Sequence, residues 1–253
     1  MKKVLLLLVA AIGCLFGSFE VRATHVSAAE ILYEYTGIPN RWLVTLKAYR
    51  DCSPGTATMP TSTSICYHSP SLGISGSFTV VLLPGSGQQV PASLSVPPGS
   101  QFQCYEEYVY QGTITLPQQA TDWKFMWQLC CMNNAINTVQ GPGGITFYTE
   151  STLNSVVAPT NNSPTFAFIP ITRWCINNQY YYSQRTTEID GDDIQYALVP
   201  ALNTTNSACP FAATPVTYIN PYSATNPIST ASGFGFNTAT GVMDYIPNLL
   251  QIG

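Results

Sequence analysis

The sequence predicts an all-β protein made of two consecutive antiparallel β-sandwich domains, of the immunoglobulin-like or cadherin-like kind. Hydrophobic residues make up 45% of the 253 residues and include 15 Tyr and 11 Phe, which excludes a disordered chain because such chains are poor in aromatic residues. Apolar and polar positions alternate in short runs that end at Pro or Gly, which is typical of strands joined by turns. Long runs rich in Ala, Leu, Glu and Lys at helical spacing are absent.

The first two strands are expected at 31–35 and 42–48, with the turn 37–40 between them, and they read as a hairpin. Further strands are expected at 77–83, 108–116, 123–130 and 145–149. In the third of these, four apolar side chains share one face and predict core positions: Trp123, Phe125, Trp127 and Leu129. The stretch between Cys52 and Gly76 is rich in Ser, Thr, Pro and Gly, which predicts a long surface loop.

A domain boundary is predicted where two prolines and several small polar residues interrupt the pattern at 157–164. The expected organisation is a signal peptide at 1–23, a cysteine-containing sandwich at 24–158, and a second sandwich at 159–253. Strands of the second unit are expected at 165–169, 179–183, 194–199 and 216–219.

The first 23 residues have the pattern of a cleavable secretory signal: Lys2 and Lys3, then an apolar run, then Val21-Arg22-Ala23. An alternative is lipid attachment at Cys14, because Ala11-Ile12-Gly13-Cys14 loosely matches a lipoprotein processing site. Cleavage after Ala23 leaves six basic and twelve acidic residues. This negative balance argues against a nucleic-acid partner, which needs clustered Lys and Arg. Because the first 23 residues have the pattern of a secretory signal, we expect an exported protein.

Seven cysteines remain after cleavage, and an oxidising compartment predicts that most form disulfides. Cys175 and Cys209 stand alone in the second unit and are the expected pair. The partners of Cys52, Cys66, Cys104, Cys130 and Cys131 stay open. Because Cys130 and Cys131 are adjacent, they would point to opposite faces of an extended strand and find different partners.

Four carboxylates gather between positions 188 and 193: Glu188, Asp190, Asp192 and Asp193. An EF-hand is excluded because its sixth and twelfth positions would be Asp193 and Val199 instead of Gly and Glu. Gly191 permits a sharp turn that lets these hard oxygen ligands converge on a calcium ion. The alternative is a plain Asp-Gly turn whose carboxylates cap backbone amides.

Catalytic signatures such as Gly-x-Ser-x-Gly or His-Glu-x-x-His are absent, so the sequence does not predict an enzyme. Glu106 and Glu107 are adjacent strand residues that face opposite ways, which disfavours a glycosidase pair. Exposed aromatic faces can stack on sugars, so carbohydrate binding is the alternative function. Its candidate residues are Trp42, Trp123, Trp127, Trp174 and Tyr180-Tyr181-Tyr182.

Several phrases, in order along the chain, resemble large exported surface proteins of the Bacteroidota. They are Ala23-Thr24-His25-Val26, Glu30-Ile31-Leu32-Tyr33, Tyr49-Arg50-Asp51-Cys52, Cys104-Tyr105-Glu106-Glu107, Gln128-Leu129-Cys130-Cys131-Met132-Asn133-Asn134 and Asn162-Ser163-Pro164-Thr165-Phe166. The stretch 188–193 resembles the Asp-x-Asp-Gly-Asp phrase of cadherin-like repeats, and 237–253 resembles the closing segment of such a repeat before its last strand.

The resemblance implies polycystic-kidney-disease (PKD) type, immunoglobulin-like or cadherin-like repeats, and a link to gliding motility or type IX secretion. It also implies that the second sandwich is truncated, lacking its last strand, and that this chain is the N-terminal part of a longer protein. We therefore expect a structural or adhesive cell-surface protein whose partners are other surface proteins or extracellular glycans.

Overall fold

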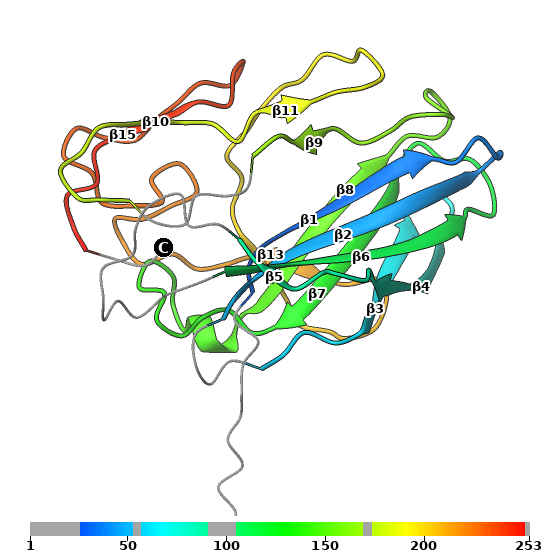
Figure 1. The fold of residues 1–253 in the computed structure, drawn as a ribbon, viewed down its shortest axis with the longest axis horizontal. Helices are drawn as coiled ribbons and strands as arrows, with labels where there is room; N and C mark the ends of the chain where they lie inside the picture. The colour runs from blue at the N-terminus through cyan, green and yellow to red at the C-terminus, as the bar shows by residue number, and fades with distance from the viewer. Residues whose placement is uncertain (1–25, 53–56, 91–104, 169–173, 251–253) are drawn as a thin grey trace, which may run out of the picture.

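The computed structural model describes residues 26–52, 57–90, 105–168 and 174–250, and these residues form an all-β structure (Figure 1). Their only helical element is the short 3-10 turn Pro142–Gly144. The predicted signal peptide, Cys14 and Cys104 lie outside the described residues. The all-β prediction is confirmed, and every pairing between the strands is antiparallel.

One large sheet of eight strands holds the first part of the chain. Its path runs β1-β2-β6-β4-β3-β7-β8, with β5 paired to β6, and it bends until β1 lies near β8, so that the sheet is nearly closed into a barrel. A single continuous sheet thus replaces the two separate sheets of the predicted sandwich. Its strands are β1 (Val26–Tyr35), β2 (Arg41–Asp51), β3 (Ser62–Ser69), β4 (Ile74–Leu82), β5 (Gln88–Gln89), β6 (Tyr105–Thr115), β7 (Trp123–Cys130) and β8 (Thr146–Leu153).

The core lies inside this curved sheet, and the alternation of the sequence explains which side chains fill it. On β2 the alternate residues Trp42, Val44, Leu46 and Ala48 are all fully buried. On β7 the predicted core residues Trp123, Phe125 and Trp127 are buried as well. Each large apolar side chain that is removed from water contributes about 1.5–3 kcal/mol, so these aromatic residues dominate the stability of the sheet.

Strand β3 corrects the prediction of a surface loop between Cys52 and Gly76. It pairs with both β4 and β7, which makes it an interior strand of the sheet. Ile65 is fully buried and Cys66 is almost fully buried. The Ser- and Thr-rich composition hid this strand, because hydroxyl residues also fit the exposed face of a strand.

Within 159–253, the residues that the structure describes form three small sheets instead of the long strands of a sandwich. They pair β9 with β11, β12 with β13, and β10 with β15 and β14. The strands are β9 (Thr165–Phe166), β10 (Tyr180–Tyr182), β11 (Thr186–Thr187), β12 (Leu202–Thr204), β13 (Ala213–Pro215), β14 (Gly235–Phe236) and β15 (Met243–Tyr245).

Two strands expected in this segment do not form. Residues 194–199 keep an alternation of exposure, with Ile194, Tyr196 and Leu198 half-buried, but they join no ladder. Tyr196 makes a single backbone hydrogen bond, in which its nitrogen lies 2.9 Å from the oxygen of Thr238. Within the expected strand 216–219, Tyr218 makes an isolated bridge to Val139, and the nitrogen of Ile219 donates to the oxygen of Thr138 at 2.9 Å, but no ladder forms. Alternation of apolar and polar residues therefore does not by itself produce a strand where no neighbouring strand pairs with the segment.

The second segment packs back onto the large sheet. Leu202, Phe211 and Ala213 lie against the buried Met126 and Tyr148 of β7 and β8. In Figure 1, β9 and β11 lie above β1 and β8, β10 and β15 lie to the upper left of the long strands, and β13 overlaps the large sheet. The last strand of the large sheet ends at Leu153, before the predicted boundary at 158 and 159, and the chain beyond it returns to contact the sheet.

The seam between β1 and β8 is bridged by side chains and by the segment that follows β8. The Tyr33 hydroxyl donates to the carbonyl oxygen of Thr152 on β8, at 2.9 Å. Ser163 exchanges two hydrogen bonds with the backbone of Tyr33: its nitrogen donates at 2.8 Å and its hydroxyl accepts at 2.9 Å. Asn162 accepts a hydrogen bond from the backbone nitrogen of Tyr35 at 2.8 Å. These contacts satisfy backbone groups of Tyr33 and Tyr35 on the free edge of β1.

Candidate functional site

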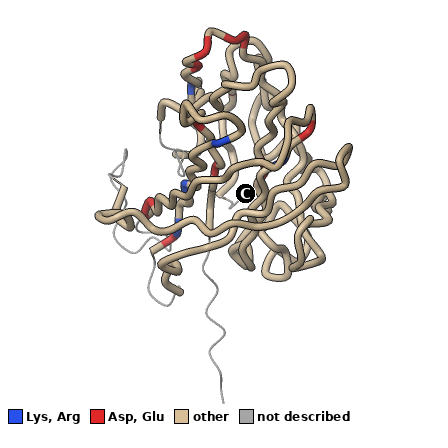
Figure 2. Tube along the Cα trace, turned by 90° about the vertical axis from the view of Figure 1, so that its right-hand side faces the viewer, with Lys and Arg blue, Asp and Glu red and all other residues tan. Residues whose placement is uncertain are grey.

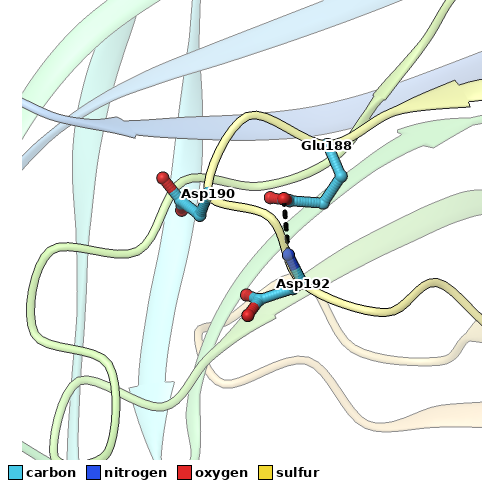
Figure 3. Close-up of side chains that lie close together, drawn as sticks. All are labelled: Glu188, Asp190 and Asp192. Carbon is cyan, nitrogen blue, oxygen red and sulfur yellow. Dashed lines mark hydrogen bonds between the residues drawn. The ribbon is translucent and has the colours of Figure 1, made fainter.

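The acidic loop of residues 188–193 follows β11 and turns at Gly191, whose φ of 85° favours glycine. The Glu188 carboxylate accepts hydrogen bonds from the backbone nitrogens of Gly191 and Asp192, the second at 2.8 Å. Figure 3 shows this carboxylate beside the Asp192 nitrogen. The capping of backbone amides that the simple turn requires is therefore present.

The same turn gathers three of the four predicted ligands. Glu188, Asp190 and Asp192 each offer a carboxylate oxygen, and these oxygens lie within 4.8 Å of one another. Asp193 is exposed and does not join the group. One oxygen of Glu188, Oε1, is buried and lacks a hydrogen-bond partner among the described residues. Since calcium takes six to eight oxygen ligands, three carboxylates would need water or further ligands to complete a site.

Asp190 has a structural role that the sequence did not reveal. Its carboxylate accepts one hydrogen bond from the backbone nitrogen of Asn162 at 2.6 Å and another from the Asn162 side-chain amide at 2.8 Å. Because Asn162 also binds the edge of β1, the acidic loop is connected to the large sheet through this residue. Burial raises the pKa of Tyr33 on the same strand, and the negative charges of Asp190 and Asp192 contribute to the rise.

The disulfides differ from the expected pairing. Cys209 is bonded to Cys66, with the two Cα atoms 5.6 Å apart, and Cys175 is a free, exposed thiol. The predicted Cys175–Cys209 pair is therefore wrong. It assumed that the second unit folds separately, whereas the segment around Cys209 packs against β3. Cys52 is also disulfide-bonded.

Cys130 and Cys131 are bonded to each other, so the expectation of different partners is wrong as well. That expectation assumed an extended strand through both residues. Strand β7 ends at Cys130, and Cys131 lies beyond it, so the alternation of strand faces does not apply.

The aromatic residues predicted for sugar binding pack against one another. The ring of Trp174 makes edge contacts with Tyr180, Tyr182 and Tyr245, at centroid distances of 4.7, 5.0 and 5.2 Å. Tyr182 and Tyr245 are buried, and Phe234 stacks on Tyr245. These rings form a small core for the sheet of β10, β15 and β14. In the run 180–182, only Tyr181 projects into solvent. Trp42, Trp123 and Trp127 are buried in the main core.

A pocket that the sequence did not predict lies over the first half of β1. Four aromatic residues and several polar residues line it, drawn from β1, β2, β8, β9, the chain just after β9 and the chain before β11: Ser27, Ala28, Ala29, Glu30, Tyr49, Phe147, Phe166, Phe168 and Gln184. These positions are widely separated in sequence, so no local pattern identified them.

Charged groups are sparse over the described trace, as Figure 2 shows, and several of them pair across neighbouring strands. Lys47 lies 3.3 Å from Glu30, and Arg50 lies 3.2 Å from Glu106. The Tyr49 hydroxyl donates to Glu107 at 3.0 Å, so the two adjacent glutamates have separate partners. This arrangement gives Glu106 and Glu107 structural roles in the sheet.

Comparison with protein-family models, with curated proteins and with solved structures gives no match to this chain. In the part of the chain that the structure describes, no helix has the length and apolar character needed to cross a membrane. The disulfides indicate an extracellular or otherwise oxidising compartment.

Proposed function

We propose that this chain is a non-catalytic module of an exported cell-surface protein with a structural or adhesive role. The observation that carries the proposal is the Cys66–Cys209 disulfide, which closes a loop across 143 positions and joins the large sheet to the segment 159–253. Disulfides of this kind are typical of proteins that work outside the reducing cytosol. The link to gliding motility or type IX secretion, and the cadherin-like or PKD-type classification, rest on the resemblance of the sequence phrases.

Calcium binding by the acidic loop is part of the same proposal. The support is the convergence of Glu188, Asp190 and Asp192 at a glycine turn, together with the unpartnered oxygen of Glu188. Extracellular modules bind calcium with dissociation constants on the order of 10⁻⁴ to 10⁻³ M. An ion here would stabilise the loop and, through Asp190, its contact with Asn162.

The location is tested by surface labelling of intact cells of the source organism, followed by N-terminal sequencing of the labelled protein. A surface protein is labelled without lysis, and cleavage of the signal leaves Thr24 as the first residue. A lipid-modified Cys14 as the first residue would identify the lipoprotein alternative. A chain that is labelled only after lysis and retains Met1 contradicts export.

The adhesive role is tested with beads that carry the purified, oxidised chain. Such beads are expected to bind cells or matrix more strongly than beads with the reduced and alkylated chain, because reduction breaks the connection between the large sheet and the second segment. Equal binding by both preparations contradicts an adhesive role for the folded module.

Carbohydrate binding is the second candidate function. Trp174 and its tyrosine neighbours support it poorly because their rings pack on one another. The pocket over β1 favours it, since aromatic walls combined with a few polar groups are the usual composition of a small-ligand site.

A further inference from the structure

The pocket over β1 lies along the part of the β1 and β8 seam that residues 161–163 do not bridge. In Figure 1, β9 and β11 extend above β1 and β8 in this region. The pocket holds about 230 Å³. Pockets for drug-sized ligands usually measure roughly 300–1,000 Å³, so this one suits a single small ring or one unit of a longer chain.

Two of its aromatic walls are fixed and two are exposed. Tyr49 is buried, and Phe147 packs its ring against Trp127 at a centroid distance of 6.2 Å. Phe166 and Phe168 are 45% and 55% exposed, and they lie two positions apart on the same arm. A cluster of exposed aromatic residues beside a hollow marks a binding surface more often than isolated apolar residues do.

The arm that carries the exposed rings is held by backbone hydrogen bonds. The nitrogen of Ala167 donates to the oxygen of Arg185 at 2.9 Å, and the nitrogen of Phe168 donates to the oxygen of Gln184 at 3.2 Å. These bonds extend the pairing of β9 with β11 by two residues. The two phenylalanine rings are therefore presented by a paired backbone, which lowers the entropy lost on binding.

The polar groups of the pocket supply both hydrogen-bond donors and acceptors. Glu30 offers a carboxylate, Gln184 a carboxamide and Ser27 a hydroxyl. One Glu30 oxygen lies 3.3 Å from Lys47, and the other, Oε2, is buried and has no hydrogen-bond partner among the described residues. Such a group gains energy when a ligand brings it a hydroxyl, because an unpaired buried acceptor is costly.

The local charge selects a neutral ligand over an anionic one. Lys47 compensates the charge of Glu30, and Glu107 contributes a further negative charge next to Tyr49. A carboxylated or sulfated ligand would be repelled here, whereas a polyol presents hydroxyl groups to Glu30 and Gln184 and an apolar ring face to the phenylalanines.

We infer that this pocket binds one neutral glycosyl residue of an extracellular glycan, with Phe166 and Phe168 stacking on the sugar ring and Glu30 and Gln184 accepting or donating to its hydroxyls. The inference rests on the carbohydrate-binding candidate function and gives it a location that differs from the aromatic residues expected from the sequence.

The test uses the purified, oxidised chain with four probes: methyl glycosides of neutral hexoses, of N-acetylhexosamines and of uronic acids, and tetramethylammonium. Binding is followed by saturation-transfer NMR and titration. A neutral glycoside is expected to bind, and the double variant F166A/F168A to weaken its affinity on the order of tenfold or more. Q184A is expected to weaken it several-fold. Tyr181→Ala is the control, because it removes an aromatic ring that is even more exposed and lies outside the pocket.

The outcomes separate the site from the function. If a neutral glycoside binds the chain and F166A/F168A binds it equally well, the pocket is the wrong site, and a loss with Tyr181→Ala instead would return the site to the run 180–182. If no glycoside binds, the carbohydrate-binding function fails together with the pocket. Preferential binding of uronic acids or of tetramethylammonium overturns the neutral-sugar inference. Unchanged circular dichroism and melting temperature of the variants exclude a folding defect.

Discussion

Asp190 and Asn162, which are 28 positions apart, form a two-bond contact in which both donors come from Asn162 and both acceptors from the Asp190 carboxylate. Asn162 in turn accepts a hydrogen bond from the backbone of Tyr35 at the free edge of β1. The Asp190 side chain thus couples the acidic loop to the large sheet through Asn162.

Removing this carboxylate is expected to lower the free energy of unfolding. Asp190→Ala deletes two hydrogen bonds, and we expect a loss of about 1 kcal/mol, because the contact is exposed to solvent. The measurement is urea denaturation at 0.15 M salt, where repulsion among exposed carboxylates is weakened. Asp193→Ala is the control, since Asp193 stands outside the group. An equal effect of the two substitutions contradicts the coupling.

Calcium is expected to stabilise the chain through the same loop. With a dissociation constant of about 1 mM, 10 mM calcium adds about 1.4 kcal/mol to the free energy of unfolding, which raises the melting temperature by several degrees. Asp192→Ala is expected to abolish the increase, because it removes a ligand oxygen and leaves the Asn162 contact intact. Asp193→Ala should retain it.

A chelator is expected to reverse the calcium effect, and magnesium to produce less of it, because magnesium demands a stricter geometry. A melting temperature that stays constant across millimolar calcium would contradict calcium binding. The loop would then be a simple turn in which Glu188 caps the nitrogens of Gly191 and Asp192.

The long strands could be predicted because each carries its own signal. On β2 and β7 the alternation of large apolar residues with polar ones is long enough to define a buried face. The strands of the second segment have only two or three residues, which is too short for a period to define their bounds. Strands β9 and β10 lie inside the expected ranges 165–169 and 179–183, whereas the strands expected at 194–199 and 216–219 do not form. Their positions depend on contacts with distant residues, such as the Cys66–Cys209 bond and the packing of Phe211 against Tyr148.

The candidate sites also divide into features that the local sequence predicts and features that it does not. The convergence of Glu188, Asp190 and Asp192 could be predicted because Gly191 and the carboxylates are neighbours in sequence. The contact with Asn162 and the pocket over β1 could not, since both are formed by segments that meet only when the sheet curves round and the chain returns across the seam. A rare apolar pair such as Phe166 and Phe168 is visible in the sequence, but its exposure is not.

The Cys66–Cys209 bond is expected to stabilise the fold substantially. It closes a loop of more than 100 residues, for which the chain-entropy account gives up to about 4–5 kcal/mol and typical measurements about 2–4 kcal/mol. The double variant C66A/C209A is expected to unfold at lower urea concentration than the wild-type protein. Cys175→Ala is the control and should have little effect, because Cys175 is free and exposed.

The pairing itself is checked by peptide mapping without reduction. The peptide that contains Cys66 should be linked to the one that contains Cys209, and iodoacetamide should label Cys175 in the denatured, unreduced protein. A peptide that links Cys175 to Cys209 would contradict the structure.

Glu30 is expected to make stability depend on pH in a direction opposite to that of an ordinary salt-bridged carboxylate. Burial raises its pKa above the ordinary value of 4.5, and repulsion by Glu107 adds to the rise, although Lys47 opposes it. The folded protein therefore holds this proton more tightly than the unfolded chain does. The contribution of Glu30 to stability is full below about pH 4.5 and is lost as the pH rises through the raised pKa.

Glu30→Gln resembles the protonated side chain, so the variant should match the wild-type protein near pH 4 and exceed its free energy of unfolding at pH 7, despite the loss of the ion pair with Lys47. Urea denaturation at both pH values measures the difference, with the exposed Glu34→Gln on the same strand as control. A variant that is less stable than the wild-type protein at pH 7 would show that the Lys47 ion pair outweighs the cost of burying the carboxylate.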